Sequence, residues 1–238
     1  MQNLQNNKNM DTGKKWYVMA AVASGLFLAT IDGSIVNIAL PVMERELNTE
    51  FAVIQWVVLG YMLTLVALML TIGRLADMFG KKPIYVAGFI IFTVGSGLCG
   101  ISTSIGMLIG FRIFQALGAV MILALGAAIV TEAFPPSERG KALGISGLMV
   151  SLGAISGPTI GGLILGSLSW HWIFFVNIPI GLVNILLVHR ILRETEKVKG
   201  RKLDLLGIIL PGLCLFCFYW RLIRERPGGG VHRQLLVY

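Results

Sequence analysis

The chain has 238 residues, of which 55% are apolar and 13% are charged, and its mean hydropathy is +0.79. A water-soluble core of this size cannot bury so much apolar sequence, so the composition excludes an ordinary soluble domain and favours a lipid bilayer as the surroundings. The formal net charge is +8, which in a soluble protein would suggest a nucleic-acid partner. The positions of the basic residues along the chain argue against that partner.

Six apolar stretches are each long enough to cross the hydrocarbon layer as a helix, which needs roughly 20 residues. They cover residues 16–40, 55–73, 84–101, 107–131, 143–165 and 173–192, and a shorter seventh run covers 205–220. The sequence therefore predicts an all-α polytopic membrane protein. A polar segment 1–15 precedes the six-helix bundle of residues 16–192, and a charged linker 193–204 leads to the incomplete seventh helix.

The first apolar stretch is interpreted as an uncleaved helix and not as a secretory signal. It is too long for a signal, it carries Asp32 in its interior, and no small-residue cleavage site follows it. Basic residues precede this stretch and follow the second, fourth and sixth stretches, whereas the opposite loops hold only Arg45. By the positive-inside rule, the N-terminus is expected in the cytoplasm, in a multi-pass protein of the cytoplasmic membrane. The basic surplus is then a topology signal, and no nucleic acid is expected as a partner.

The tail of residues 221–238 breaks this charge pattern. It is basic, it contains Pro-Gly-Gly-Gly at 227–230, and it holds no further apolar span. We interpret it as the result of a truncation or a change of reading frame near Trp220. An intact reading frame with a natural stop after Tyr238 would contradict this hypothesis.

Two charges lie inside apolar stretches, Asp32 in the first and Arg112 in the fourth. A charge at mid-membrane depth costs about 2.5–3.5 kcal/mol on insertion scales, so such residues usually face a bundle interior or a water-filled cavity. The two stretches run in opposite directions, which places both charges at a similar depth, as expected for partners. A carboxylate whose distance from a cation or whose hydration changes would gain and lose a proton. The alternative is a fixed structural ion pair. Gln115 shares a helix face with Arg112 and either lines the same cavity or bonds a neighbouring helix.

The connection after the second stretch has the pattern Gly-x-x-x-Asp-x-x-Gly-Lys-Lys, formed by Gly73, Asp77, Gly80, Lys81 and Lys82. A tight turn with permissive dihedrals at Gly80 is the simplest interpretation. The spacing also resembles the major facilitator superfamily, whose loop between helices two and three has this pattern. That resemblance implies a conformational lock, in which Gly73 allows close helix approach and Asp77 meets a helix N-terminus in the other half of the protein.

The fifth stretch contains Gly-Pro-x-x-Gly-Gly, and Gly153, Gly157 and Gly161 recur every four residues before and within it. This spacing leaves a groove without side chains on one helix face, and Pro158 favours a bend. Together with Gly162, the pattern resembles the antiporter motif of drug exporters, which implies a bending or sealing element and not a binding site.

Three further stretches resemble the same superfamily: residues 108–119 with Arg112, residues 31–41 with Asp32, and residues 170–181. The last is similar to the opening of helix six in the fourteen-helix branch of drug:proton antiporters, with His171 in place of the usual arginine. The resemblance implies two inverted three-helix repeats and about half of a longer transporter. Glu132, at the end of the fourth stretch, is a candidate partner for Lys81 or Lys82.

These motifs together favour the N-terminal half of a proton-coupled multidrug exporter that works by alternating access. The resemblance implies that Asp32 and Arg112 couple protons and that Asp32, Asn37, Arg112 and Gln115 line the substrate cavity. Small amphipathic, often cationic drugs would be the substrates. The proton gradient would supply the energy, and no cofactor or metal is expected. The alternatives are a metabolite or nutrient carrier of the same superfamily, and a non-transporting remnant or membrane interaction partner. An enzyme is not expected, because no nucleophile, base and orienting acid gather on facing helices.

Overall fold

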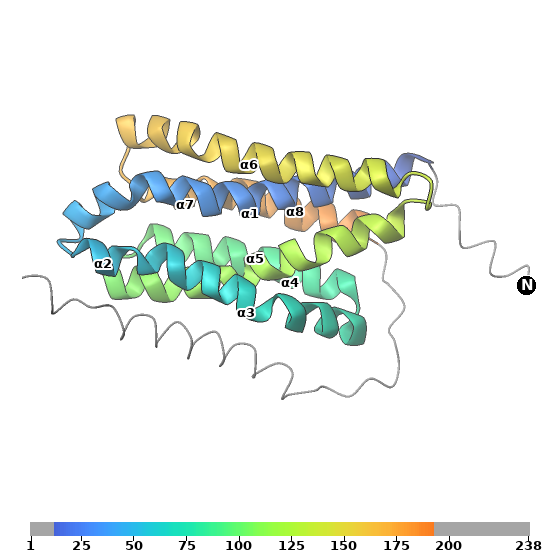
Figure 1. Ribbon diagram of the computed structural model, residues 1–238, viewed down its shortest axis with the longest axis horizontal. Coiled ribbons are helices and arrows are strands. Elements are labelled where there is room, and N and C mark those ends of the chain that lie inside the picture. The colour runs from blue at the N-terminus through green and yellow to red at the C-terminus, as the bar shows by residue number, and fades with distance from the viewer. Residues whose placement is uncertain (1–11, 193–238) are drawn as a thin grey trace, which may run out of the picture. The chain divides into compact units, whose positions relative to one another are not determined.

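The computed structural model describes residues 12–192. Within this range the regular structure is entirely helical, and the bundle of long, roughly aligned helices is drawn in Figure 1. The helical segments are α1 (Thr12–Glu46), α2 (Phe51–Ile54), α3 (Trp56–Phe79), α4 (Lys81–Gly100), α5 (Ile105–Ala133), α6 (Arg139–Ser167), α7 (Trp172–Phe175) and α8 (Asn177–Ile191).

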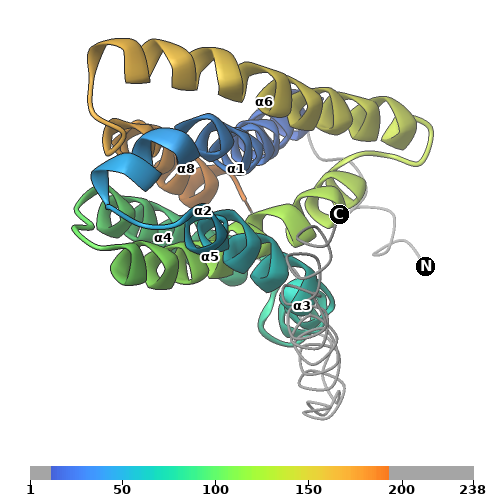
Figure 2. The same ribbon diagram turned by 60° about the vertical axis from the view of Figure 1, so that its left-hand side comes forward.

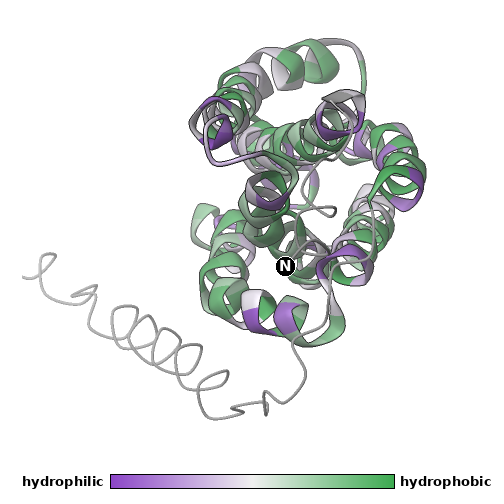
Figure 3. Ribbon diagram, turned by 90° about the vertical axis from the view of Figure 1, so that its right-hand side faces the viewer, coloured by the Kyte–Doolittle hydropathy of each residue, from purple (hydrophilic) through white to green (hydrophobic). Residues whose placement is uncertain are grey.

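Six stretches of these helices are long and apolar enough to cross a membrane, as the sequence predicts. The short helices α2 and α7 each continue almost directly into the next helix, so that Phe51–Phe79 and Trp172–Ile191 each make one crossing. Figure 3 shows that apolar residues dominate the ribbon of the bundle. The fold is therefore that of a multi-pass membrane protein. The seventh run, the linker and the basic tail predicted after residue 192 lie outside the described residues.

The first helix is longer than the apolar stretch that predicts it. It begins at Thr12, within the segment expected to be a polar extension, and it continues through Pro41 to Glu46. Hydropathy marks the part of a helix that matches lipid, and the polar turns beyond it carry no apolar signal. Proline removes only one backbone donor, so it need not end a helix of this length. By contrast, Pro135 comes two residues after Ala133, the last residue of α5.

Close packing against α1 organises the bundle. Figures 1 and 2 show α6 running along α1, and glycines of α6 contact side chains of α1 in the same order along both helices. A Cβ atom placed on Gly153 would meet Thr30, and one placed on Gly161 would meet Ile38. The two helices therefore run in parallel. On its other sides α1 contacts α5 and α8, while α4 packs against α5 and α8.

Ion pairs and aromatic contacts connect the helices at the end of the bundle where α1 begins. Lys15 Nζ lies 2.6 Å from Glu138 Oε2, just before α6 starts. The ring of Trp16 meets that of Phe134 edge-on, with 5.5 Å between the ring centroids. The start of α1 is thus connected to the turn between α5 and α6.

At the opposite end, where α1 finishes, Trp170 is the main anchor. Its indole Nε1 donates to Glu46 Oε2 at 2.9 Å, and its side chain is only 1% exposed. His171 stacks on Trp170 at a centroid distance of 3.7 Å, and its Nε2 is 3.3 Å from the carbonyl oxygen of Ser102. These contacts connect the turn before α7 with α1 and with the turn after α4.

Candidate functional site

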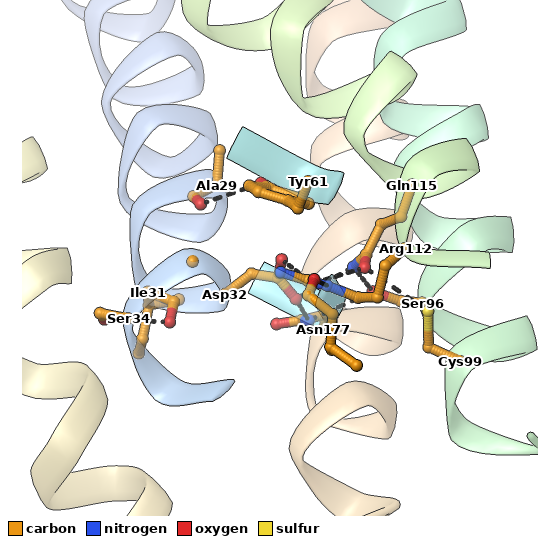
Figure 4. Close-up of polar contacts among 12 residues, drawn as sticks. Ala29, Ile31, Asp32, Ser34, Tyr61, Ser96, Cys99, Arg112, Gln115 and Asn177 are labelled. Atoms are coloured by element: carbon orange, nitrogen blue, oxygen red, sulfur yellow. Dashed lines mark hydrogen bonds and ion pairs between the residues drawn. The ribbon is translucent and has the colours of Figure 1, made fainter. Parts of the chain in front are cut away.

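A buried ion pair lies between α1 and α5, midway along the bundle. Arg112 Nη1 donates to Asp32 Oδ2 at 2.7 Å, and the two side chains are 1% and 0% exposed. Figure 4 shows Asp32 pointing from α1 toward α5, on the side of the helix opposite to Ser34. The partnership predicted from the matching depths of Asp32 and Arg112 is confirmed.

Three neutral polar side chains complete the cluster around this pair, and we call the five residues the Asp32 cluster: Asp32, Ser96, Arg112, Gln115 and Asn177. Gln115 Nε2 donates to Asp32 Oδ1 at 3.0 Å, and Asn177 Nδ2 donates to the same oxygen at 2.7 Å. Ser96 Oγ accepts from both amides, at 2.5 Å from Gln115 and 3.2 Å from Asn177. All five side chains are fully buried or nearly so. The cluster therefore joins α1, α4, α5 and α8 through polar contacts.

Aromatic rings and a backbone carbonyl surround the guanidinium. The centre of the Arg112 guanidinium is 4.0 Å from the Tyr61 ring centroid and 5.7 Å from that of Phe174. Arg112 Nε donates to the Val57 carbonyl oxygen at 3.5 Å, while Nη2 has no hydrogen-bond partner among the described residues. Cation–π contacts of this kind stabilise a cation where water is absent. Arg112 thus remains charged in an apolar interior, with both N–H groups of Nη2 unpaired among the described residues.

Glycine permits the close helix contact that positions Gln115. A Cβ atom placed on Gly95 of α4 would lie 2.7 Å from the Cα atom of Gln115. Any larger residue would push α4 and α5 apart, since no side chain lies between to yield. Because Ser96 follows Gly95 directly, the same approach brings its hydroxyl to Gln115. Gly95 therefore sets the spacing between α4 and α5 across which Ser96 and Gln115 form their hydrogen bond.

The Asp32 cluster contains three of the four residues predicted to line the substrate cavity, and the lining of a cavity by the fourth, Asn37, stays a prediction. Gln115 belongs to the cluster, by interhelical hydrogen bonds. Asn37 does not, because its side chain is exposed and donates to the Gly33 carbonyl oxygen of its own helix at 3.3 Å. Sequence reasoning missed Ser96 and Asn177. The signal for Asn177 was an amide inside an apolar stretch, where an unpaired polar group is costly.

The loop between α3 and α4 has the conformation expected of its glycine. Gly80 has φ 96°, a left-handed value that favours glycine. Lys81 forms an ion pair with Glu132 of α5, so the predicted partnership of Glu132 with one of the two lysines is confirmed. Lys82 is the second residue of α4, and Asp77 lies in the last turn of α3.

Gly73 lies inside α3, six residues before the last residue of that helix. A Cβ atom on Gly73 would meet no atom within 4 Å in the described part of the chain. The close approach that the resemblance implies for Gly73 therefore stays a prediction about another part of the protein.

The glycines of α6 divide into a packed set and an open one. Cβ atoms placed on Gly153 and Gly157 would lie 2.9 Å from the Phe27 carbonyl oxygen and from the Ile35 amide nitrogen, respectively. Gly161 is equally tight, but a Cβ atom on Gly162 would meet nothing within 4 Å among the described residues. The groove predicted from the four-residue spacing is therefore filled by α1. Pro158 lies inside α6 without ending it.

Comparison with curated proteins identifies transporters as relatives. The chain is 43% identical over 202 residues to the riboflavin transporter RibZ of Clostridioides difficile, which covers 84% of this chain and 44% of that protein. It is 33% identical to multidrug resistance protein 3 of Bacillus subtilis, over 87% of this chain and 40% of that protein. It is 32% identical to the tetracenomycin C resistance and export protein of Streptomyces glaucescens, over 91% of this chain and 40% of that protein. The chain thus spans less than half the length of these relatives.

A solved structure and a family model agree with this result. The fold matches a bacterial homologue of the human lysosomal transporter Spinster, solved in an inward-facing and unoccupied conformation. The TM-score is 0.63 at 20% identity, and the match covers 82% of this chain and 47% of that one. The family model of the major facilitator superfamily matches residues 22–231, which include the first part of the basic tail. The chain therefore belongs to the major facilitator superfamily.

Proposed function

We propose that this chain supplies a six-helix bundle of a proton-coupled multidrug exporter of the cytoplasmic membrane, with its N-terminus in the cytoplasm. The observation that carries the proposal is the fully buried pair of Asp32 and Arg112. Relatives that are multidrug resistance proteins support the choice of substrate class. In this proposal the substrates are amphipathic, often cationic molecules, and the proton gradient supplies the energy.

The chemistry of proton coupling follows from the environment of Asp32. An ionised carboxylate in an apolar interior survives only because a cation and hydrogen-bond donors stabilise it. A motion that separates it from Arg112, or that admits water from one side, changes its affinity for a proton. If each side of the membrane gains access in turn, Asp32 binds a proton on one side and releases it on the other. Export of a substrate in the opposite direction would then complete the cycle.

The remaining motifs have places in this scheme. The Gly73 to Lys82 segment would act as a lock at the cytoplasmic end, with Asp77 meeting a second bundle. The Gly153 to Gly162 segment of α6 would bend or seal as the conformations alternate. Transport is proposed for the assembly of this bundle with a second, C-terminal bundle, as in the fourteen-helix branch. The share of each relative that the chain covers supports that division.

The test is proton-driven export in energised, inverted membrane vesicles that contain the protein. We expect Asp32→Asn to abolish dye accumulation driven by a proton gradient, because the amide keeps the shape of the carboxyl group but cannot exchange a proton. Glu44→Gln is the matched control, since Glu44 is a carboxylate of the same helix outside the Asp32 cluster. Unchanged dye export in Asp32→Asn would overturn the proposal.

A metabolite carrier of the same superfamily is the second candidate function. The relative named as a riboflavin transporter supports it, at 43% identity. Radiolabelled riboflavin, supplied on either side of the vesicle membrane, separates the two candidates. Gradient-dependent movement of riboflavin without movement of cationic dyes would favour the carrier, and the converse would favour the exporter. A chain that moves neither probe would support the alternative of a non-transporting membrane protein.

A further inference from the structure

Asn177 is the member of the Asp32 cluster that α8 supplies. It is the first residue of α8, directly after the break that separates this helix from α7, and its side chain is 1% exposed. We propose that Asn177 is a positioning residue for Asp32, whose amide stabilises the ionised carboxylate and has to turn when Asp32 takes up a proton. The inference rests on the proposed proton-coupling role of Asp32 and extends it to a second residue and helix.

The hydrogen bonds around Asp32 fit only its ionised form. Oδ2 accepts from Arg112 Nη1 at 2.7 Å, and Oδ1 accepts from Gln115 at 3.0 Å and from Asn177 at 2.7 Å. All three partners present N–H donors, and an ionised carboxylate is an acceptor only. A protonated Asp32 would carry a donor, and none of these three partners offers it an acceptor in the orientation seen here. One of the three partners must therefore turn if it is to accept the hydrogen bond of the protonated carboxyl group.

Neither Arg112 nor Gln115 is free to make that change. A guanidinium has no acceptor, so Arg112 cannot receive a hydrogen bond from a protonated Asp32. The Gln115 oxygen already accepts from Arg112 Nη1 at 2.7 Å, which fixes the orientation of this amide with its nitrogen toward Asp32. Turning Gln115 would oppose two donors at Arg112. The pairing with Arg112 thus excludes both residues from the exchange.

The Asn177 amide has no such restriction. Its remaining contact within the cluster is Ser96 Oγ at 3.2 Å, and a hydroxyl both donates and accepts. A turn of the amide by half a rotation would present Asn177 Oδ1 to a protonated Asp32 and to the Ser96 hydroxyl. Protonation of Asp32 on α1 would thereby change the hydrogen bonds of the first turn of α8, next to the break between α7 and α8.

Other titratable groups also face Asp32 and remain the same in the variants below. Among residues 12–192 they are Arg112 from α5, Tyr61 from α3, and Cys99 from α4. Cys99 contacts the cluster through Gln115 Oε1, at 3.7 Å. From α8, the contact with Asp32 is the neutral amide of Asn177. Removing that amide changes the hydrogen bonds of Asp32 without changing the charge around it.

Asn184 provides a matched control on the same helix. Its side chain is also 1% exposed, and it lies two turns after Asn177. Its Oδ1 accepts from Ser24 Oγ at 2.5 Å, and its Nδ2 donates to the Ile180 carbonyl oxygen at 3.0 Å. It therefore bridges α8 to α1 as Asn177 does, but away from Asp32. A general loss of α1–α8 packing would affect both variants alike.

The experiment is an infrared titration of the full chain in lipid nanodiscs, in which Asp32→Asn identifies the band of the protonated Asp32 carboxyl group. We expect Asn177→Leu to shift the midpoint of this band to higher pH by roughly one unit or more, because the ionised form loses a charge-assisted hydrogen bond. Asn177→Gln keeps an amide, so its midpoint should lie closer to the wild-type value than that of Asn177→Leu. Asn184→Leu should leave the midpoint at the wild-type pH.

A midpoint unchanged in Asn177→Leu would overturn the inference, and so would an equal shift in Asn184→Leu. If Asn177→Leu fails to fold, Asn177→Ser removes the amide without adding apolar bulk, and the same two criteria apply to it. The titration requires no transport. Failure of proton-driven export would therefore contradict the proposed function without changing this result.

Discussion

The Nη1 atom of Arg112 and the Oδ2 atom of Asp32 lie 2.7 Å apart in a part of the bundle where neither side chain exceeds 1% exposure. Charges so deeply buried are costly to separate from their partners, because water cannot replace the lost contact. The pair thus fixes the spacing of α1 and α5, and it makes the stability of the bundle sensitive to the removal of either charge alone.

We expect Arg112→Leu to lower the free energy of unfolding by about 3–5 kcal/mol, because it leaves the Asp32 carboxylate buried and uncompensated. The double variant Asp32→Asn/Arg112→Leu should recover part of this loss, since no uncompensated charge remains. Denaturant titration of the full chain in mixed micelles measures both. Equal losses in the single and the double variant would show that the charge of Asp32 does not couple to that of Arg112.

The packing of α6 on α1 gives a second prediction. Gly157→Ala should destabilise the protein by about 1–3 kcal/mol relative to Gly162→Ala, because its Cβ atom would overlap Ser34, whereas a Cβ atom on Gly162 would meet nothing within 4 Å among residues 12–192. Both substitutions raise helix propensity by the same amount, so their difference isolates the contact. Thermal unfolding in lipid measures the two variants side by side.

Ser34 supplies the control for that comparison. Ser34→Gly removes the side chain that the new methyl group would meet, while the contact with the Ile35 amide nitrogen at 2.9 Å remains. Gly157→Ala should therefore cost less in the Ser34→Gly background than in the wild-type chain. A Gly157→Ala variant as stable as Gly162→Ala would contradict the packing described for α1 and α6.

Much of the fold and part of the site follow from the sequence alone. Runs of apolar residues predict the membrane crossings. The Asp32–Arg112 pair can be predicted because a charge inside an apolar stretch is costly in lipid and needs a partner. The extension of α1 past Pro41 could not be predicted in this way, because helical turns outside the hydrocarbon layer have the same polar composition as a loop. Asn37 and Asn177 both lie inside apolar stretches, and only their helix orientation decides that one is exposed and the other binds Asp32. That orientation depends on contacts among four helices, which sequence spacing does not specify.

The ion pair of Lys81 and Glu132 gives a third prediction. The side chains are 15% and 46% exposed, so water screens the pair and each single neutralisation should cost no more than about 1 kcal/mol. Lys81→Glu should cost more, because it places two like charges together, and Lys81→Glu/Glu132→Lys should restore most of the loss. Unfolding titrations at low and high salt measure this, since the recovery should shrink as salt rises. If the double variant Lys81→Glu/Glu132→Lys were no more stable than Lys81→Glu alone, a direct pairing of these two residues would be excluded.

Burial of Cys99 allows a fourth prediction, on access to the Asp32 cluster. Its side chain is 0% exposed and its Sγ lies 3.7 Å from Gln115 Oε1, so a maleimide should modify it only after unfolding. The experiment uses the full chain with Cys214 and Cys217 replaced by serine, so that Cys99 is the remaining thiol. Labelling is followed by the gain in mass.

Thr103→Cys in the same background is the matched control. Thr103 lies in the turn between α4 and α5, one turn beyond Cys99, and its side chain is exposed. This new thiol should react readily with the same reagent under native conditions, whereas Cys99 should not. Rapid labelling of Cys99 in the folded chain would mean that water reaches the cluster in the resting state, because a maleimide reacts with the thiolate and needs the same path. In that case Asp32 would be solvated before any conformational change, and the fully buried ion pair would not be the resting state of the protein.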